Sequence, residues 1–539
     1  MNFFLSNKVK RAAAAAAACA MLGAMPFVLT GCGDESGASA SGEKVIKMGM
    51  GSAWKDLIPY NNSSGGYYSG IVLGLLYDRL MYIGDDGKVS PRAADSWEFS
   101  DDKRTVTFHL NKNLKWSDGT PVTAKDYLFA AKMITDPDCP AALKSRMKIL
   151  KGVNTTGNRD GAEPFGVEAP DDYTLIYKTD DPIDELSTFS QYMYDFLPIP
   201  EHLLKDMKPA DYLKHDNWTH PVTDGPLAFD SMVAGSQLIM KANKDYHMGA
   251  PNFDKMIIQV MAPSNMASSL ISGDIDLAYP TLTEDDVKTL EGSGKLKVVR
   301  EKAPSQPYMV YVNQSVLPDK RIRQAMDKAI DREALAKLLQ HAEPIETPIR
   351  KDSKYYDDAV KYNYDPAAAK AIFQSAVADG AVSADQEFVI TTPPGIREKC
   401  ANIIQQNMQA IGMNTKIEVT EAATMFAGFS NGKTEIALVN RSASQDPMYM
   451  AYHLTSNPPY WSHITYSLWD DYYKAYLNAS DADKVGIVKD YQKSWLDDVP
   501  VIFYASTYKD YGYNPRIEGA IDLPDADYGN LPVWKWSVK

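Results

Sequence analysis

The sequence predicts an α/β protein built from more than one domain. Its 539 residues are too many for a single compact core, so two or three domains are expected. In the C-terminal half, strand-like segments alternate with amphipathic helical segments, a pattern typical of a parallel sheet with crossover helices. In the N-terminal half, apolar and polar residues alternate within short segments bounded by turns, which indicates half-buried strands.

One unit of strand, turn and helix can be assigned in the N-terminal half. Apolar residues alternate from Val106 to Leu110, which predicts a strand with one buried face. A turn is expected at residues 117 to 119, where Ser and Asp precede Gly. Thr123 then provides a cap for a helix that is predicted to run to Ile134.

The C-terminal half predicts a parallel, doubly wound sheet. Residues 387 to 392, 415 to 419 and 435 to 440 are predicted strands. The helix between the first two strands has one apolar face and is expected to end at Gly412. Upstream, residues 322 to 330 place apolar side chains at helical spacing, which we interpret as core packing. Strands linked through helices in this way run parallel.

The N-terminus has the layout of an export signal. Three basic residues precede an uncharged run from residue 12 to residue 29, and residues 29 to 32, Leu-Thr-Gly-Cys, resemble a bacterial lipoprotein box. We therefore predict a signal peptide at 1 to 31, a lipidated Cys32 as the mature N-terminus, and a flexible polar tether at 32 to 43. The alternatives are a retained transmembrane anchor and a plain soluble export signal, and the alanine-rich composition of the run disfavours the first.

The composition argues against several classes of function. The net charge of −14 becomes more negative once the basic signal is removed, which disfavours binding to nucleic acid or to anionic lipid beyond an acyl anchor. Cys139 and Cys400 are far apart in sequence and are expected to be free. The sequence has neither a CxxC pair nor an HExxH spacing, so we predict no metal site and no cofactor.

Five further segments form an ordered pattern. They read WSDGTPVTAKD from 116, GPLAFDSMVAGSQLIMKAN from 225, LISGDIDLAY from 270, YVNQSVLPDKRIRQAMDKAIDREAL from 311 and YNYDPAAAKAIF from 362. In this order they resemble the extracellular solute-binding proteins of family 5, the oligopeptide- and dipeptide-binding lipoproteins of ABC importers. Five matches in the family's order are far more specific than any one of them alone.

The resemblance implies a two-lobed periplasmic-binding-protein-like α/β fold with a hinge, plus an inserted α+β subdomain in the first lobe. Mapped onto this sequence, the first lobe is discontinuous and comprises residues 44–76, 179–303 and 510–539. The inserted subdomain is expected at 77–178 and the second lobe at 304–509. The family holds its ligand between the lobes and delivers it to a membrane permease.

Three segments match the family's ligand-lining loops, at residues 57 to 68, 303 to 314 and 439 to 450. Extended peptides can be held there as an added strand with side chains in wet pockets. The predicted ligand-binding residues from these segments are Tyr60, Asn61, Tyr67, Ser305, Gln306, Tyr308, Arg441, Gln445, Asp446 and Tyr449. Trp461 is added because an amphipathic ring suits a wet apolar cleft. No catalytic residues are predicted.

One departure from the family concerns the charge that anchors the ligand. Peptide binders of the family often carry an aspartate three residues before an Asp/Glu-Pro pair, where it meets the peptide's α-ammonium group. Counting back from Asp446 gives Ala443 in this sequence. The free amino terminus of a peptide would therefore need another partner, and Asp446 itself is equally compatible with the start of a helix.

We expect a lipid-anchored component of an ABC importer on the outer face of the cell membrane, acting as a monomer. Its expected partners are a short peptide, the permease with its ATPase subunits, and the membrane through the lipid anchor. Alternatives with the same fold bind an oligosaccharide, a metal chelate or another small solute. Alternatives from other classes are a peptide signal receptor and a lipid-anchored hydrolase, although the sequence lacks a GxSxG elbow and a complete phosphate loop.

Overall fold

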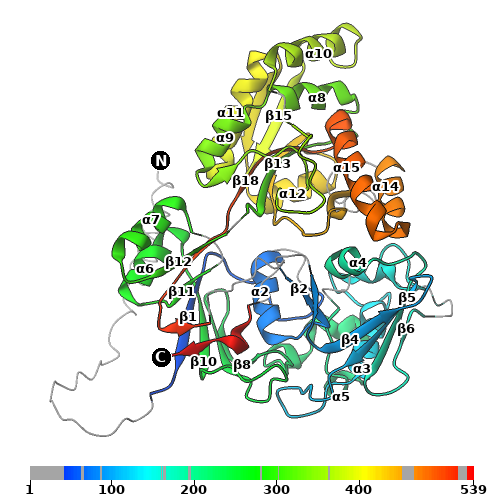
Figure 1. Ribbon diagram of the computed structural model, residues 1–539, viewed down its shortest axis with the longest axis vertical. Helices are drawn as coiled ribbons and strands as arrows, with labels where there is room; N and C mark the ends of the chain where they lie inside the picture. Colours follow the sequence, from blue (N-terminus) through cyan, green and yellow to red (C-terminus); the bar gives the residue numbers. More distant parts are fainter. Residues whose placement is uncertain are drawn as a thin grey trace, which may run out of the picture. The chain divides into compact units, whose positions relative to one another are not determined.

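The computed structural model describes residues 42–61, 66–84, 88–159, 161, 165–191, 196–279, 282–301, 303–361, 364–451, 467–519 and 531–539. The predicted signal peptide, Cys32 and Trp461 lie outside these residues. Within them, the chain forms one seven-stranded, one six-stranded and one four-stranded sheet, together with their helices (Figure 1). None of the described helices is both long and apolar enough to cross a bilayer.

The seven-stranded sheet collects strands from three distant parts of the chain. Its central strand β1 pairs in parallel with β10 on one side and with β11 on the other. The strand order is β12 (Lys297–Arg300), β19 (Asp510–Tyr513), β11 (Leu277–Ala278), β1 (Val45–Met50), β10 (Lys255–Val260), β9 (Gln237–Ala242) and β8 (Leu227–Val233). We call this sheet the first lobe, with its helices α2 (Gly66–Leu76), α6 (Met266–Ser272) and α7 (Glu284–Ser293).

The four-stranded sheet lies between α2 and β8 in the sequence and forms an inserted part of the first lobe. Its order is β4 (Ala94–Phe99), β5 (Thr105–Leu110), β7 (Thr174–Lys178) and β6 (Val167–Glu168). Helix α3 (Ala124–Ile134) begins as predicted after Thr123, whose backbone N–H donates to Asp126 Oδ2 at 2.8 Å. The predicted turn before α3 uses Gly119 at φ 91°, a backbone conformation that favours glycine.

Shorter elements complete the first lobe. They are the hairpin of β2 (Met81–Ile83) and β3 (Val89–Pro91), the helices α4 (Glu185–Gln191) and α5 (Glu201–Leu204), and the pair of β20 (Ile517–Glu518) and β21 (Ser537–Val538).

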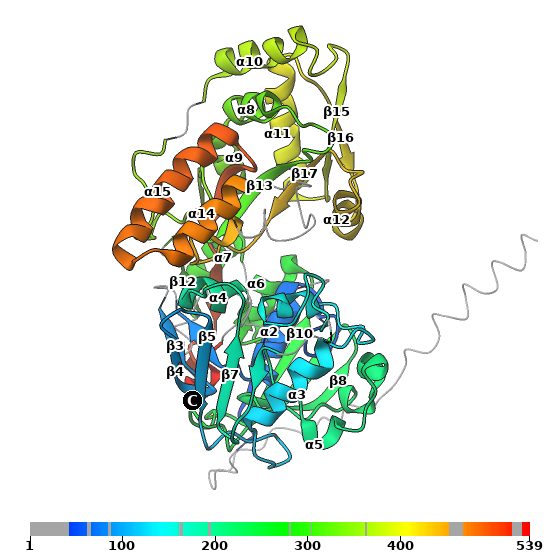
Figure 2. The ribbon, with the colours of Figure 1, turned by 90° about the vertical axis from the view of Figure 1, so that its right-hand side faces the viewer.

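The six-stranded sheet forms the second lobe. Its order is β14 (Ala342–Glu343), β18 (Ile502–Thr507), β13 (Gln306–Val312), β17 (Ile436–Asn440), β15 (Glu387–Thr392) and β16 (Asn414–Val419). Its helices are α8 (Lys320–Ala329), α9 (Arg332–Leu339), α10 (Pro366–Ala378), α11 (Ile396–Ala410), α12 (Ala422–Ser430), α14 (Ser467–Asn478) and α15 (Asp481–Asp498). Helices α14 and α15 pack side by side (Figure 2), and β13 and β18 run next to each other (Figure 1).

The prediction of parallel pairing is confirmed for the three strands on which it was based, and the other strands of this sheet run antiparallel to their neighbours. Strand β15 pairs in parallel with both β16 and β17, as the intervening helices require. Strand β13, however, is antiparallel to both β17 and β18. The reason is topological, because β13 carries the chain out of the first lobe and β18 carries it back. Neighbouring strands that cross between the lobes in opposite senses must be antiparallel.

The two crossings between β12 and β13 and between β18 and β19 form the hinge. Glu301 joins them, because its carboxylate accepts hydrogen bonds from Ser305 Oγ at 2.8 Å and from the Lys509 N–H at 2.7 Å. The N–H of Ser305 donates to the Thr507 carbonyl at 3.1 Å. The hinge is therefore a hydrogen-bonded double connection.

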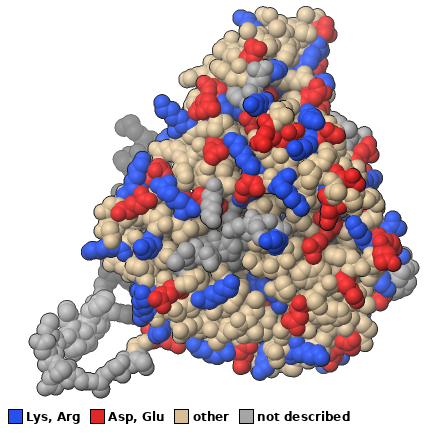
Figure 3. All heavy atoms as spheres, viewed as in Figure 1, with Lys and Arg blue, Asp and Glu red and all other residues tan. Residues whose placement is uncertain are grey.

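The described residues include both cysteines that are expected to be free. Cys139 and Cys400 are both buried and free. On the face shown in Figure 3, lysines and arginines are interspersed with aspartates and glutamates, which is the arrangement of an ordinary solvated surface.

Candidate functional site

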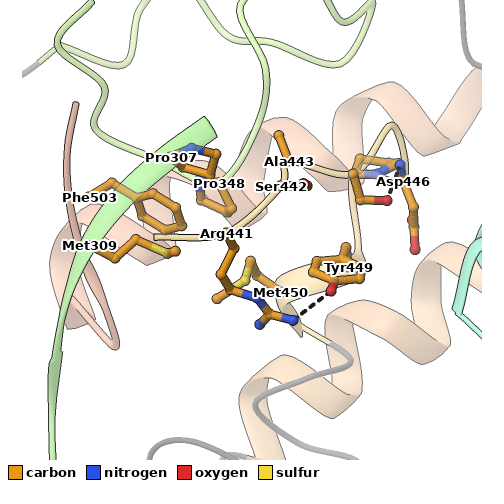
Figure 4. Close-up of a pocket in the computed structure, with 12 residues that line it drawn as sticks. Pro307, Met309, Pro348, Arg441, Ser442, Ala443, Asp446, Tyr449, Met450 and Phe503 are labelled. Atoms are coloured by element: carbon orange, nitrogen blue, oxygen red, sulfur yellow. Dashed lines mark hydrogen bonds between the residues drawn. The ribbon is translucent and has the colours of Figure 1, made fainter. Parts of the chain in front are cut away.

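A pocket opens in the second lobe where the segment after β17 passes the start of β13 (Figure 4). The space within the pocket and at its mouth, open solvent included, is about 330 Å³. The residues that line it are Pro307, Met309, Pro348, Arg441, Ser442, Ala443, Ser444, Asp446, Pro447, Tyr449, Met450 and Phe503. Two of the three sequence segments expected to contact a ligand, 303 to 314 and 439 to 450, thus meet at one place.

Backbone pairing holds these two segments together. Beyond the end of β17, the N–H of Arg441 donates to the Pro307 carbonyl at 3.1 Å, and the N–H of Ala443 donates to the Ser305 carbonyl at 2.7 Å. Gln306 Nε2 adds a side-chain bond to Ser442 Oγ at 3.2 Å. The pocket wall is therefore an extension of the sheet.

Arg441 is the basic side chain of the pocket. Its Nη2 donates to the Tyr449 hydroxyl at 2.6 Å, and its guanidinium carbon lies 5.1 Å from the centre of the Tyr449 ring. Figure 4 shows the two side chains meeting at one side of the pocket. The phenol orients the guanidinium through both a hydrogen bond and a cation–π contact.

Asp446 also lines the pocket but is engaged in structural contacts. Asp446 is 3% exposed. Its Oδ1 accepts a hydrogen bond from the Met448 N–H at 2.9 Å and another from Ser187 Oγ at 2.7 Å. The contact with Met448 satisfies a backbone donor at the start of the helical residues 449–451. The geometry therefore matches the alternative interpretation of Asp446 as a residue at a helix start.

The strand pleat separates Tyr308 from the pocket. Pro307 and Met309 line the pocket, and successive side chains in a strand point to opposite faces. Tyr308 lies on the opposite face, where its ring is 6.0 Å from that of Tyr504, and burial raises the pKa of its hydroxyl. Ser305 is fully buried, and its hydroxyl is directed to Glu301 in the hinge. Gln445 is half-buried in the loop between Ser444 and Asp446.

The three first-lobe residues predicted to bind a ligand are not among the residues that line this pocket. Tyr60 is 3% exposed and its hydroxyl donates to the Leu197 carbonyl at 2.6 Å, while Asn61 Nδ2 donates to Asp56 Oδ2 at 2.7 Å. Tyr67 is half-buried, and Lys509 Nζ from the hinge lies 5.6 Å from the centre of its ring. Their ligand contacts remain predictions, as does that of Trp461, which lies outside the described residues.

Sequence reasoning missed several apolar residues of the pocket. Met309 could have been found from the alternation of β13, because it shares a face with Pro307. Met450 lies within a matched segment, but an apolar side chain there gives no signal of ligand contact. Pro348 and Phe503 come from other parts of the chain, and no local pattern indicates which wall they form.

Polar contacts also join the two lobes near the pocket. Lys484 of α15 forms an ion pair with Asp184 of the first lobe, and the two side chains are 6% and 10% exposed. The bond from Ser187 to Asp446 lies alongside, because Asp184 Oδ1 accepts from the Ser187 N–H at 3.1 Å. These contacts couple the pocket loop to the opposite lobe.

A cluster of ligand-type side chains occurs at the hinge, outside the pocket. Atoms of Glu284, His341 and Asp510 lie within 4.8 Å of one another. Arg300 already supplies a positive charge there, with Nη1 3.0 Å from Glu284 Oε2, and His341 Nδ1 is 2.7 Å from Asp510 Oδ2. We interpret the cluster as an ion-pair network that joins hinge strands.

Residues 88–462 match the family described as bacterial extracellular solute-binding proteins, family 5 Middle. The chain is similar to the oligopeptide-binding protein AppA of Bacillus subtilis, with 24% identity over 498 residues that cover 86% of this chain and 87% of AppA. Among solved structures, DppA from Helicobacter pylori in complex with the peptide STSA has a TM-score of 0.76 at 21% identity, covering 92% of this chain and 98% of DppA.

NikZ from Campylobacter jejuni, in complex with Ni(L-His), has a TM-score of 0.75 at 20% identity and covers 92% of this chain and 99% of NikZ. These likenesses extend over nearly all of the described chain. The predicted two-lobed α/β fold is confirmed.

Proposed function

The chain belongs to the bacterial extracellular solute-binding proteins of family 5, and from this premise we propose that it captures short peptides and delivers them to an ABC permease. The observation that carries the proposal is that two segments predicted to contact a ligand surround one pocket beside the hinge. The similarity to a protein named for binding oligopeptides supports peptide as the solute.

The pocket chemistry suits a peptide segment. Residues 441–444 run as irregular backbone along the pocket, and such backbone can pair with an extended ligand as an added strand. Apolar surfaces from Met309, Met450 and Phe503 can accept side chains of varied shape. A site of this kind selects for an extended backbone more than for a particular sequence.

Two related proposals complete the transport role. Cys32 carries the lipid that holds the protein at the outer face of the membrane, and a permease receives the peptide from the lobes. A variant Cys32→Ser tests the first proposal by fractionation and by incorporation of labelled fatty acid. Labelling that persists in the variant would contradict it.

The ligand is best identified from protein purified under native conditions. Mass spectrometry of released material is expected to detect peptides of about three to eight residues, and calorimetry with a synthetic copy is expected to give saturable binding at one site. Released oligosaccharide, or a metal chelate like the Ni(L-His) bound to NikZ, would favour the alternatives with the same fold. A peptide that binds and is hydrolysed would support the hydrolase alternative.

Importer and receptor share this binding step and need a separate experiment. Deletion of the gene is expected to abolish uptake of the identified peptide, measured with an isotope-labelled form. Unchanged uptake with loss of a peptide-dependent response would favour the receptor.

A further inference from the structure

Four histidines among the described residues pair with a carboxylate, and the pairs differ in what they join. Three of the pairs lie within the first lobe, namely His109 with Glu98, His202 with Asp118 and His247 with Asp78. The fourth joins the lobes, because His341 precedes β14 of the second lobe and Asp510 begins β19 of the first. Imidazole is the side chain that ordinarily titrates between about pH 5 and pH 8, so this contact across the hinge involves a group that changes charge near neutral pH.

His341 is held by the crossing from β18 to β19. Its ring stacks on that of Tyr508, with the ring centres 4.2 Å apart and the planes at 9°. Its backbone carbonyl accepts a hydrogen bond from the Tyr508 N–H at 3.3 Å. The crossing consists of Tyr508 and Lys509, between the end of β18 and the start of β19. A change of backbone angles at these two residues turns Asp510 relative to β14 and so alters the contact between His341 and Asp510.

Asp510 relies on His341 for compensation of its charge. The residue is 2% exposed, and within the part of the chain that the structure describes its Oδ1 has no hydrogen-bond partner. Burial raises the pKa of its carboxyl, and the charge of His341 opposes that shift. Arg300 is also near, but its Nη1 is 3.8 Å from Asp510 Oδ2, beyond hydrogen-bonding distance. Loss of the proton from His341 therefore leaves a buried carboxylate with less compensation.

Two further carboxylates face the imidazole. Glu284 offers an oxygen within 4.8 Å of a ring nitrogen of His341. The hydrogen bond from Arg300 lowers the pKa of Glu284, and the His341 charge acts in the same direction. Burial would raise the pKa of Glu343, but its hydrogen bonds and the charges of Lys351 and His341 hold it below the ordinary value. The charged residues of the surrounding segments are Glu284, Lys288 and Glu291 on α7, Arg300 and Glu301 at the end of β12, Glu343 and Lys351 at and after β14, and Lys509 and Asp510 at the crossing.

We propose that His341 makes the hinge responsive to pH. When the imidazole carries a proton, its charge pairs with Asp510 and Glu284 and stabilises the arrangement in which the lobes meet through Lys484 and Asp184. When the imidazole is neutral, it keeps a hydrogen bond to Asp510 but loses the charge, and the lobes separate more readily. A lower pH therefore favours the arrangement in which the lobes meet. This inference goes beyond peptide capture and does not depend on which ligand is bound.

Small-angle scattering coupled to size-exclusion chromatography tests the inference on protein freed of bound ligand. Between about pH 8 and about pH 5.5, we expect the ratio of wild-type molecules with lobes in contact to molecules with lobes apart to rise about fivefold or more, which decreases the radius of gyration. His341→Gln has a neutral amide and should keep the wild-type radius of pH 8 at both pH values. His109→Gln is the matched control, because His109 pairs with Glu98 between β5 and β4 of one sheet and should respond as wild type does.

Lys484→Met provides a second background for the same measurement. It lacks the ion pair between the lobes and should contain more molecules with the lobes apart at pH 8. Lowering the pH should compact this variant as well, whereas the double variant with His341→Gln should not respond. Urea denaturation at both pH values checks that each variant is folded.

Three results would overturn the inference. The first is a radius that does not decrease on acidification in either wild-type protein or Lys484→Met, and the second is a decrease that persists in His341→Gln. The third is loss of the response in His109→Gln as well, which would assign the effect to the total charge of the protein instead of the hinge. These results leave peptide capture untouched, because the measurement contains no ligand.

Discussion

Two sets of buried polar contacts differ in what they join. Asp78, Arg92 and His247 meet inside the first lobe, where their side chains are at most 3% exposed. Asp184 and Lys484 are nearly as buried, but one belongs to each lobe. The first set must persist whenever the first lobe is folded, whereas the second can be broken if the lobes separate about the hinge.

This difference determines which measurement reports the free energy of each contact. Removing one partner of a buried ion pair leaves a charge without compensation and costs about 3 to 5 kcal/mol when the site cannot open. Between lobes, separation returns the remaining charge to water, which limits the cost. Contacts within a lobe should therefore affect unfolding, and contacts between lobes should affect closure and ligand affinity.

The largest effect is expected from Asp78→Asn. Arg92 would lose its buried partner, and His247 would lose an acceptor that lies 2.6 Å from its Nε2. We expect the free energy of unfolding to fall by about 3 to 5 kcal/mol, measured by urea denaturation of the first lobe transition. Asp172→Asn is the control, because Asp172 pairs with Lys125 on the surface and should cost at most about 1 kcal/mol. Similar losses in the two variants would contradict the comparison.

The contacts of Asp78 also predict that the free energy of unfolding depends on pH. This effect is smaller than the total loss of unfolding free energy in Asp78→Asn. Burial alone raises the pKa of Asp78, but the Arg92 charge and the His247 contact outweigh it and hold the pKa below its ordinary value of 3.8. A lowered pKa in the folded state stabilises the protein above about pH 4, and this contribution is lost as the pH falls toward the lowered pKa.

Wild-type protein should therefore lose more stability between about pH 5 and pH 3 than Asp78→Asn does, measured by urea midpoints at each pH. Asp224, whose pKa is raised by burial and then by the Asp78 charge, contributes with the opposite sign. Because Asp78→Asn removes the second of these causes, Asp224 makes the difference between the two pH curves smaller. Parallel pH curves for the two proteins would show that Asp78 is not held as an anion.

Lys484→Met tests the contact between the lobes. We expect a loss of about tenfold or more in affinity for a peptide recovered from the purified protein, with little change in the free energy of unfolding. Small-angle scattering should also show that the Lys484→Met protein needs a higher ligand concentration to reach the compact state. Lys489→Met is the matched control on the same helix, because Lys489 is 42% exposed and lies 4.0 Å from Asp357 within the second lobe. A large loss of stability with unchanged affinity would reverse the assignment.

The distinction between local contacts and contacts that join distant parts of the chain also explains what the sequence could predict. Periodicity identified the strands and helices, because local pattern follows from which face is buried. It did not give the direction of β13, which depends on the chain crossing between lobes twice. Strand direction is a property of the whole topology.

Site residues were harder to predict for a related reason. The matched segments contain both Arg441 and Asp446, and both line the pocket, yet Asp446 is held by Ser187 from the opposite lobe. Tyr60 lies in a matched loop but packs in the core of the first lobe. Segment order indicates where a ligand site lies, whereas the facing of each side chain depends on contacts from distant parts of the chain.

The smallest predicted effect concerns Ser187. Its hydroxyl donates to Asp446 Oδ1 at 2.7 Å and so connects the first lobe to the pocket loop. Because Asp446 keeps its bond from the Met448 N–H, Ser187→Ala should remove about 1 kcal/mol and weaken peptide affinity about fivefold, measured by calorimetry. Ser100→Ala is the control, since Ser100 donates to Asp102 on the exposed surface.

In the double variant Ser187→Ala with Lys484→Met, the losses should be less than additive, because once Lys484 is gone the lobes close less often and the Ser187 bond forms in fewer molecules. Full additivity would show that the two contacts act independently, and that closure is not the step they share.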